Sequence, residues 1–210
     1  MSMTVFLYFS SYKDVDSDVK FLLNDKSINN IYVNGNVTRV IEGNTSDISF
    51  IILPTKNVDF NSYLLLAKEL KENGYDVYIA GYLMNRYYNE DPMNYVLNLN
   101  KENEVYYVIS HGDIDNGALD YMNNHKELFK GLIMLDGHDI KNDNLETLYL
   151  CSDDFDIDIK DNNHIRIKGA SFDGFSNYEN KQLNNLEASK QRQITVDLIL
   201  EFINGDDYEK

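Results

Sequence analysis

The segment Val108–Met122, VISHGDIDNGALDYM, combines a buried apolar run, a glycine-containing turn and the start of a helix. Enzymes with a side-chain nucleophile often place it on such a turn, because the sharp bend exposes the attacking atom beside backbone N–H donors. The tip offers Gly112, Asp113, Ile114 and Asp115, without a serine, cysteine or threonine. Asp113 could attack as a carboxylate and form a covalent ester. We favour the simpler interpretation, in which Asp113 is a helix N-cap.

A nucleophile at this turn would need a base to accept its proton and an acid to orient that base. The histidines of the chain are His111, His125, His138 and His164. Of these, His111 and His138 follow predicted strands closely enough to be candidate bases. The only cysteine, Cys151, lies near the end of a predicted strand, where a buried and unreactive thiol is the usual role.

Aspartates are frequent near the predicted strand ends, which raises the alternative of a Mg²⁺ or Ca²⁺ site. The candidate ligands are Asp113, Asp115, Asp136, Asp139, Asp153, Asp154 and Asp156. The segment DDFDIDIKD (153–161) superficially resembles a calcium loop, but apolar residues interrupt it and the required glycine is absent. Its alternation is more typical of a half-exposed extended segment. We therefore expect no metal site and no cofactor.

The elements that would position these residues fall into two regions. The first region predicts short antiparallel strands at 19–23 (VKFLL), 30–33 (NIYV) and 37–42 (VTRVIE), with the turn NGN joining the last two. Beyond it, apolar strands at 48–54, 75–82, 104–110, 131–136, 147–152 and 164–169 alternate with helices near 60–73, 115–124 and 187–203. This alternation predicts a single α/β domain over residues 1–210, a three-layer α/β/α sandwich with a mostly parallel sheet.

Two helical stripes are expected to face the sheet. One consists of Tyr63, Leu66, Ala67 and Leu70, in a helix capped by Asp59 and ended by Gly74; the other consists of Ile194, Leu198 and Phe202. The longest irregular stretch is 83–100, and a long loop beyond a strand often covers a site. Aromatic residues in or beside it (Tyr82, Tyr87, Tyr88, Tyr95) and near the C-terminus (Phe172, Phe175, Tyr178) could line an apolar pocket or simply pack the loops.

Composition limits the classes of partner. The formal net charge is −16, which argues against nucleic acid and anionic membranes because the electrostatic interaction would be repulsive. The single cysteine excludes an intramolecular disulfide and favours a cytoplasmic protein. The apolar run near the start is too short for a signal peptide or a membrane span.

Several local motifs, in order, resemble one family. LPTKNVDFNSY (53–63), ENGYDVYI (72–79), LYLCSDDF (148–155), GASFDGFSNY (169–178) and QRQITVDLILEFI (191–203) match words of the α/β-hydrolase superfamily, specifically a small subgroup similar to dienelactone hydrolases. In the segment after the strand at 75–82, Leu83 stands where the subgroup has Pro. After the strand at 147–152, Asp154 stands where the subgroup has Gly. The resemblance runs from about residue 18 to residue 203.

The resemblance implies a Ser-His-Asp triad and shows which members are missing. Register by the following helix puts Ile114 at the nucleophile position, and this is the register we prefer; the alternatives put Asp113 or Gly112 there. Phe172 falls at the base position, while Asp153 keeps the acid position. The side chains of Ile114 and Phe172 are hydrocarbons, so the first cannot attack a carbonyl and the second cannot accept a proton. Losing a triad member typically removes roughly four to six orders of magnitude in rate.

We therefore expect an α/β-hydrolase-fold protein that is catalytically inactive as an esterase or lactonase and that serves as a small-ligand-binding or other non-catalytic homologue. A small apolar ligand would be held by Pro54, Thr55, Tyr82, Tyr87, Tyr88 and Phe175. The alternative is an active ester or lactone hydrolase with a non-standard nucleophile such as Asp113, served by His138 or His111.

Overall fold

Within the residues that the structure describes, the sheet has eight strands in the order β1-β2-β4-β3-β5-β6-β7-β8. The computed structural model describes residues 12–25, 31–34, 37–40, 47–81, 91–98, 105–140, 145–156 and 163–205. The strands are β1 (Ile31–Asn34), β2 (Val37–Val40), β3 (Ile48–Leu53), β4 (Asp76–Ala80), β5 (Val105–His111), β6 (Phe129–Leu135), β7 (Glu146–Cys151) and β8 (His164–Arg166). All pairings from β4 to β8 are parallel, whereas β1 pairs with β2, and β2 with β4, in antiparallel fashion. The mostly parallel α/β sheet with antiparallel strands at one edge is thus confirmed.

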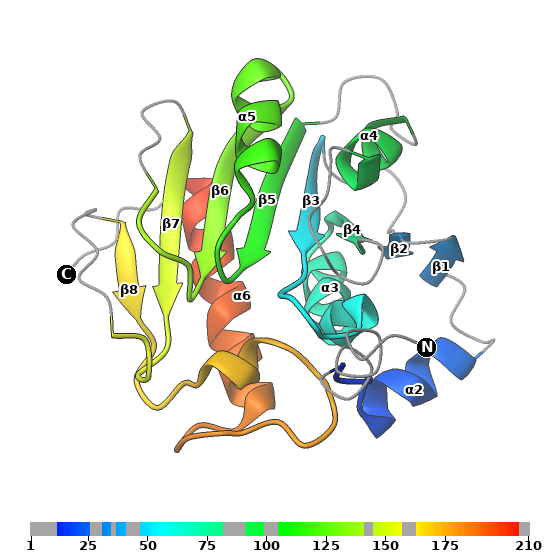
Figure 1. Ribbon diagram of the computed structural model, residues 1–210, viewed down its shortest axis with the longest axis vertical. Helices are drawn as coiled ribbons and strands as arrows, with labels where there is room; N and C mark the ends of the chain where they lie inside the picture. The colour runs from blue at the N-terminus through cyan, green and yellow to red at the C-terminus, as the bar shows by residue number, and fades with distance from the viewer. Residues whose placement is uncertain are drawn as a thin grey trace, which may run out of the picture.

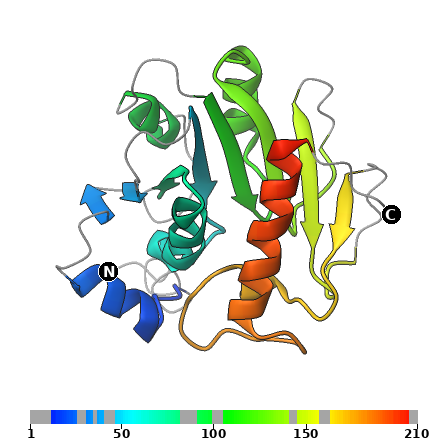
Figure 2. The same ribbon diagram turned by 180° about the vertical axis from the view of Figure 1, so that it is seen from behind.

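Helices lie on both faces of this sheet (Figures 1 and 2). They are α2 (Ser17–Asn24), α3 (Leu64–Glu72), α4 (Asp91–Asn98), α5 (Asn116–Asn124) and α6 (Ala188–Asn204), with 3₁₀ turns η1 (Phe60–Tyr63) and η3 (Phe172–Phe175). Side chains alternate between two apolar clusters: Phe50 and Ile52 join the one that holds α3 and α6, whereas Ile51 and Leu53 join the one that holds α4 and α5. Strands buried on both faces explain the continuous apolar runs in the sequence.

The strand predicted at 19–23 is wrong, because these residues belong to helix α2. Asp16 caps this helix by accepting a hydrogen bond from the Val19 backbone N–H at 3.1 Å. Val19 is buried and Leu22 and Leu23 pack against the core, a spacing that suits a helix, whereas Phe21 is 67% exposed. The short apolar run thus had the composition of a strand and the packing periodicity of a helix.

Helices α3 and α6 fill the face of the sheet seen in Figure 2. The predicted stripe Tyr63, Leu66, Ala67 and Leu70 is fully buried. On α6 the prediction is only partly right: Phe202 is buried, but Ile194 and Leu198 are half-buried, and the innermost positions are Gln191, Thr195, Val196 and Ile199. Gln191 lies inward because its amide exchanges two hydrogen bonds with the Ser171 backbone.

Two predicted boundaries also change. Asp59 caps the 3₁₀ turn η1, accepting from the Asn61 N–H at 2.8 Å, and α3 begins only after that turn. The stretch 83–100 is not wholly irregular, because α4 occupies Asp91–Asn98 and buries Met93 and Val96. Among the described helices, none has the length and apolar character that a bilayer crossing requires.

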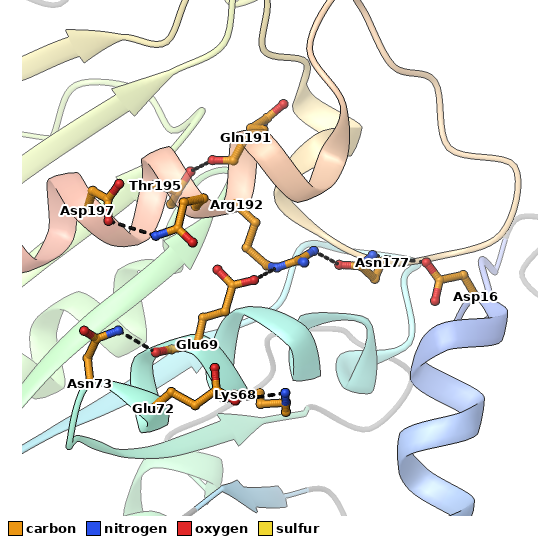
Figure 3. Close-up of polar contacts among 11 residues, drawn as sticks. Asp16, Lys68, Glu69, Glu72, Asn73, Asn177, Gln191, Arg192, Thr195 and Asp197 are labelled. Atoms are coloured by element: carbon orange, nitrogen blue, oxygen red, sulfur yellow. Dashed lines mark hydrogen bonds and ion pairs between the residues drawn. The ribbon is translucent and has the colours of Figure 1, made fainter.

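A chain of polar contacts ties α2, α3 and α6 together (Figure 3). Arg192 of α6 forms an ion pair with Glu69 of α3 and also donates to the Asn177 side-chain oxygen at 3.3 Å. Asn177 in turn donates to Asp16, the cap of α2, at 3.1 Å. The loop that follows β8 is thereby held to α6 and to the N-cap residue of α2.

Candidate active site

The candidate residues lie where parallel strands end. The carboxyl ends of β3, β5, β6 and β7 share one edge of the sheet, because these strands are parallel neighbours. Four of the turns at this edge are 54–55 after β3, 112–115 after β5, 136–138 after β6 and 152–153 after β7. Open α/β sheets bind their ligands at this edge.

The turn after β5 bends sharply at Gly112, whose φ is +79°. Its N–H donates to the Leu135 carbonyl of β6 at 2.8 Å, which fixes the bend. A Cβ added at Gly112 would lie 3.5 Å from the Thr55 Oγ1, an ordinary contact. Ile114, the residue of our preferred register, is 8% exposed and packs in the cluster beneath α5. The left-handed position is therefore Gly112, and neither residue carries a nucleophilic atom.

Asp113 is not the N-cap of α5, which corrects our interpretation of it. Asp115 caps the helix, accepting from the Gly117 N–H at 2.8 Å. The sequence contains two aspartates before the helix, and the second one, Asp115, has the extended backbone of an N-cap residue.

Asp113 instead pairs with His138. Its Oδ1 accepts a hydrogen bond from the His138 backbone N–H at 3.0 Å and contacts the ring Nδ1 at 2.5 Å. Partial burial works against ionisation, but these contacts outweigh it, so the pKa of the Asp113 carboxyl is below its ordinary value. Both side chains are exposed, 62% for Asp113 and 60% for His138.

The turn after β6 is shaped to make that contact. Asp136 has a φ of +50°, and its buried carboxylate accepts from the Ser152 N–H and hydroxyl, both at 2.6 Å. Burial raises the pKa of Asp136 against these two hydrogen bonds. Gly137 passes so close to the preceding turn that a Cβ there would lie 2.8 Å from the Gly112 carbonyl oxygen. The close approach of the two turns thus places His138 within hydrogen-bond distance of Asp113.

His111 ends β5 inside the protein. Its Nδ1 lies 2.6 Å from the Tyr63 hydroxyl, which accepts from the Thr55 N–H at 3.0 Å. Among the described residues its Nε2 finds no partner with hydrogen-bond geometry, although the Phe172 backbone lies close enough to favour the protonated form. Burial nevertheless lowers the pKa of His111 to about 3. His111 is therefore neutral at physiological pH.

Two phenylalanines cover His111. The ring centroid of Phe172 lies 4.2 Å from that of the imidazole, and that of Phe175 lies 5.6 Å away in an edge contact. Phe172 begins η3, in the segment after β8 where the resemblance places the base. The residue that the resemblance places at the base position therefore contacts a histidine, but its own side chain is a hydrocarbon that covers the imidazole.

Asp153, which the resemblance places at the acid position, follows β7 and is exposed. Its carboxylate accepts from the Gly169 N–H at 2.5 Å, and its own N–H donates to the Ala170 carbonyl at 3.1 Å. These contacts fasten the turn after β7 to the segment after β8. Asp153 thus serves the backbone there, and its described hydrogen bonds include none to an imidazole.

The residues expected to line a pocket are divided. Pro54 and Phe175 are buried, and Thr55 is half-buried, with its N–H bonded to Tyr63. Tyr82, Tyr87 and Tyr88 lie outside the described residues, so the expected aromatic loop stays a prediction.

The surroundings of Cys151 and of the candidate metal ligands do not favour a catalytic or metal-binding role. Cys151 is 1% exposed, and burial raises the pKa of its thiol to about 11, which leaves it protonated and unreactive. No three histidine, cysteine, aspartate or glutamate side chains gather for a metal in the part of the chain that the structure describes.

The sequence raised the pairing of Asp113 with His138 only as one of two alternatives, and the structure brings these two residues into contact. Each residue followed a predicted strand, but only the adjacency of β5 and β6 brings them together. No protein-family model matches the chain, and a search of curated proteins finds no relative.

Proposed function

We propose that this protein has the α/β-hydrolase fold and has lost the esterase and lactonase chemistry of the triad. The order of the candidate positions supports this proposal: a strand–turn–helix elbow after β5, Asp153 after β7 and Phe172 after β8 follow the chain order nucleophile, acid, base. The sharp turn at Gly112 supports an elbow whose attacking side chain is gone.

The observation that carries the proposal is the tilted ring contact between Phe172 and His111. A base after β8 should present a nitrogen lone pair toward the elbow. Here the ring at that position has none, and it covers the nearest imidazole at a centroid distance of 4.2 Å. With neither a hydroxyl nor a reachable base, acyl transfer through these positions has no route.

An ester assay tests the loss of triad chemistry. We expect the protein to hydrolyse p-nitrophenyl esters no faster than its Asp153→Ala variant, because the acid has no base to orient. A serine-directed fluorophosphonate should leave the protein unlabelled. A rate clearly above that of Asp153→Ala, or a fluorophosphonate adduct, contradicts the proposal.

The role that remains is binding of a small apolar ligand at the edge of the sheet formed by the ends of β3 and β5. Pro54, Thr55 and Phe175 provide apolar and small side chains there, and Tyr82, Tyr87 and Tyr88 complete the proposed lining. A melting-temperature increase with small apolar carboxylates or lactones, reduced in Thr55→Val, would support this role. The absence of any increase across such a panel would argue against it.

A second candidate function is an ester or lactone hydrolase with Asp113 as nucleophile. The contact of His138 with Asp113 favours it, since an imidazole beside an acyl-aspartate could activate the water that hydrolyses it. Loss of an ester-hydrolysing activity in Asp113→Asn, together with accumulation of an acyl adduct on Asp113 in His138→Gln, would distinguish it. Equal turnover in the wild type and in Asp113→Asn would exclude it.

A further inference from the structure

We propose that His138 is a nucleophilic acyl-accepting site, with its Nε2 as the attacking atom and Asp113 as the residue that positions the ring and stabilises the positive charge that acyl transfer places on it. This site uses neither Asp153 nor Phe172, so it is independent of the proposed function. The substrate class is small activated acyl donors, whose leaving group departs without a proton.

The hydrogen bonds fix which ring nitrogen is available. An ionised carboxylate only accepts, so the Nδ1 that contacts Asp113 Oδ1 carries the hydrogen, and the lone pair is on Nε2. The same Oδ1 also accepts from the His138 backbone N–H at 3.0 Å. Two bonds from one residue to one oxygen restrict rotation of the ring, and 60% exposure of the side chain leaves it accessible to a reagent.

The other histidines lack this combination. His111 is 1% exposed and stacked under Phe172. His125 is half-buried, stacks on Tyr121 at 4.2 Å between centroids, and directs its Nδ1 to the neutral Tyr121 carbonyl. His164 is half-buried at the start of β8. His125 is therefore a matched internal comparison: an imidazole whose Nδ1 meets an oxygen without a charge.

The step balances without another reactant. The Nε2 lone pair attacks the carbonyl carbon, an N–C bond forms, and the bond from that carbon to the leaving oxygen breaks, so that the oxygen departs with the electron pair. The ring becomes an N-acylimidazolium, and the Asp113 carboxylate stabilises its positive charge through the Nδ1 hydrogen. Water can then cleave the N–C bond, which releases the acid and restores the imidazole.

The surroundings favour uncharged aromatic donors. The Phe155 ring lies 5.8 Å from the His138 ring between centroids, in an edge contact, and offers an apolar surface beside the imidazole. The net charge of −16 would repel anionic acyl donors. Neutral aryl esters and similar activated carbonyl compounds are therefore the class that the site would accept.

Labelling with diethyl pyrocarbonate, an activated acyl donor, tests the proposal. With the adducts quantified by peptide mass spectrometry over time, we expect His138 in the full-length protein to react at least about tenfold faster than His125 or His164. In Asp113→Asn, whose side-chain oxygen can still accept both hydrogen bonds, the rate at His138 should fall roughly tenfold, because the stabilising charge is gone. His138→Gln should lose this adduct alone.

The matched control is Asp120→Asn, which removes one exposed charge from α5 and should leave the rate at His138 unchanged. Equal labelling of His138 and His125 in the wild type would overturn the proposal. An unchanged rate in Asp113→Asn would overturn the part assigned to Asp113, since it would show that geometry alone sets the reactivity. The Asp153→Ala variant should label His138 normally, so failure of the proposed function would be seen separately.

Discussion

At the residue scale, the burial of His111 couples protonation to stability. In the unfolded chain a histidine titrates near its ordinary value of 6.5, whereas burial lowers the pKa of His111 in the folded protein to about 3. Between these two values the unfolded chain takes up a proton that the folded protein does not. The unfolded state is therefore favoured increasingly as the pH falls through this window.

This coupling predicts a pH dependence specific to His111. Above pH 6.5, the lowered pKa of His111 should not reduce the free energy of unfolding. The loss of unfolding free energy should grow as the pH falls and level off below pH 3 at roughly a few kcal/mol. Chemical denaturation from pH 7 to pH 4 should show a steeper loss of unfolding free energy in the wild type than in His111→Phe. Parallel curves for the two proteins would show that His111 is not held neutral.

Two glycines at the candidate site should respond differently to alanine. Gly112→Ala places a methyl group at an ordinary van der Waals distance from Thr55. Only the positive φ of residue 112 should therefore destabilise the folded state, by about 1–2 kcal/mol. Gly137→Ala places a methyl group 2.2 Å from Met134 Cε and 2.8 Å from the Gly112 carbonyl oxygen, so the two turns must separate. Denaturant unfolding should show the larger loss in Gly137→Ala, and the opposite order would contradict the described contact.

At the element scale, the sequence predicted the parallel strands well and their contacts poorly. β3 to β7 are buried on both faces, so their apolar runs are nearly continuous and easy to recognise. The run 19–23 was misassigned because five residues contain too little periodicity to separate a strand from a helix. The pairing of Asp113 with His138 depends on strand order, which no local pattern encodes.

The α3–α6 contact yields a prediction about buried and exposed ion pairs (Figure 3). The side chains of Arg192 and Glu69 are 14% and 22% exposed, whereas those of Lys68 and Glu72 on α3 are 42% and 52% exposed. A double-mutant cycle on Arg192 and Glu69 should give a coupling of about 1–3 kcal/mol. The same cycle on Lys68 and Glu72 should give less than about 0.5 kcal/mol. Similar couplings would mean that burial of the first pair has no energetic effect.

At the scale of the whole molecule, the large negative net charge is the dominant electrostatic feature. A net charge of −16 makes the folded state repel itself more than the expanded unfolded state does. Raising NaCl from about 20 mM to about 500 mM should therefore raise the melting temperature, since the Debye length falls from roughly 20 Å to a few ångströms. A melting temperature that falls with salt would show that attractive pairs such as Arg192–Glu69 outweigh the repulsion.

The segment before α2 is joined to the loop before α6. Val15 bridges to Tyr178, the Asp16 N–H donates to the Asn177 carbonyl at 3.2 Å, and the Glu179 N–H donates to the Asp14 carbonyl at 2.9 Å. During synthesis, helix α2 is made before residues 177–179, which hold the segment that precedes it. The apolar surface of α2 therefore stays partly uncovered until those residues have left the ribosome. The interval in which a chaperone can bind this surface is thus set by the time needed to synthesise the 161-residue separation between Asp16 and Asn177.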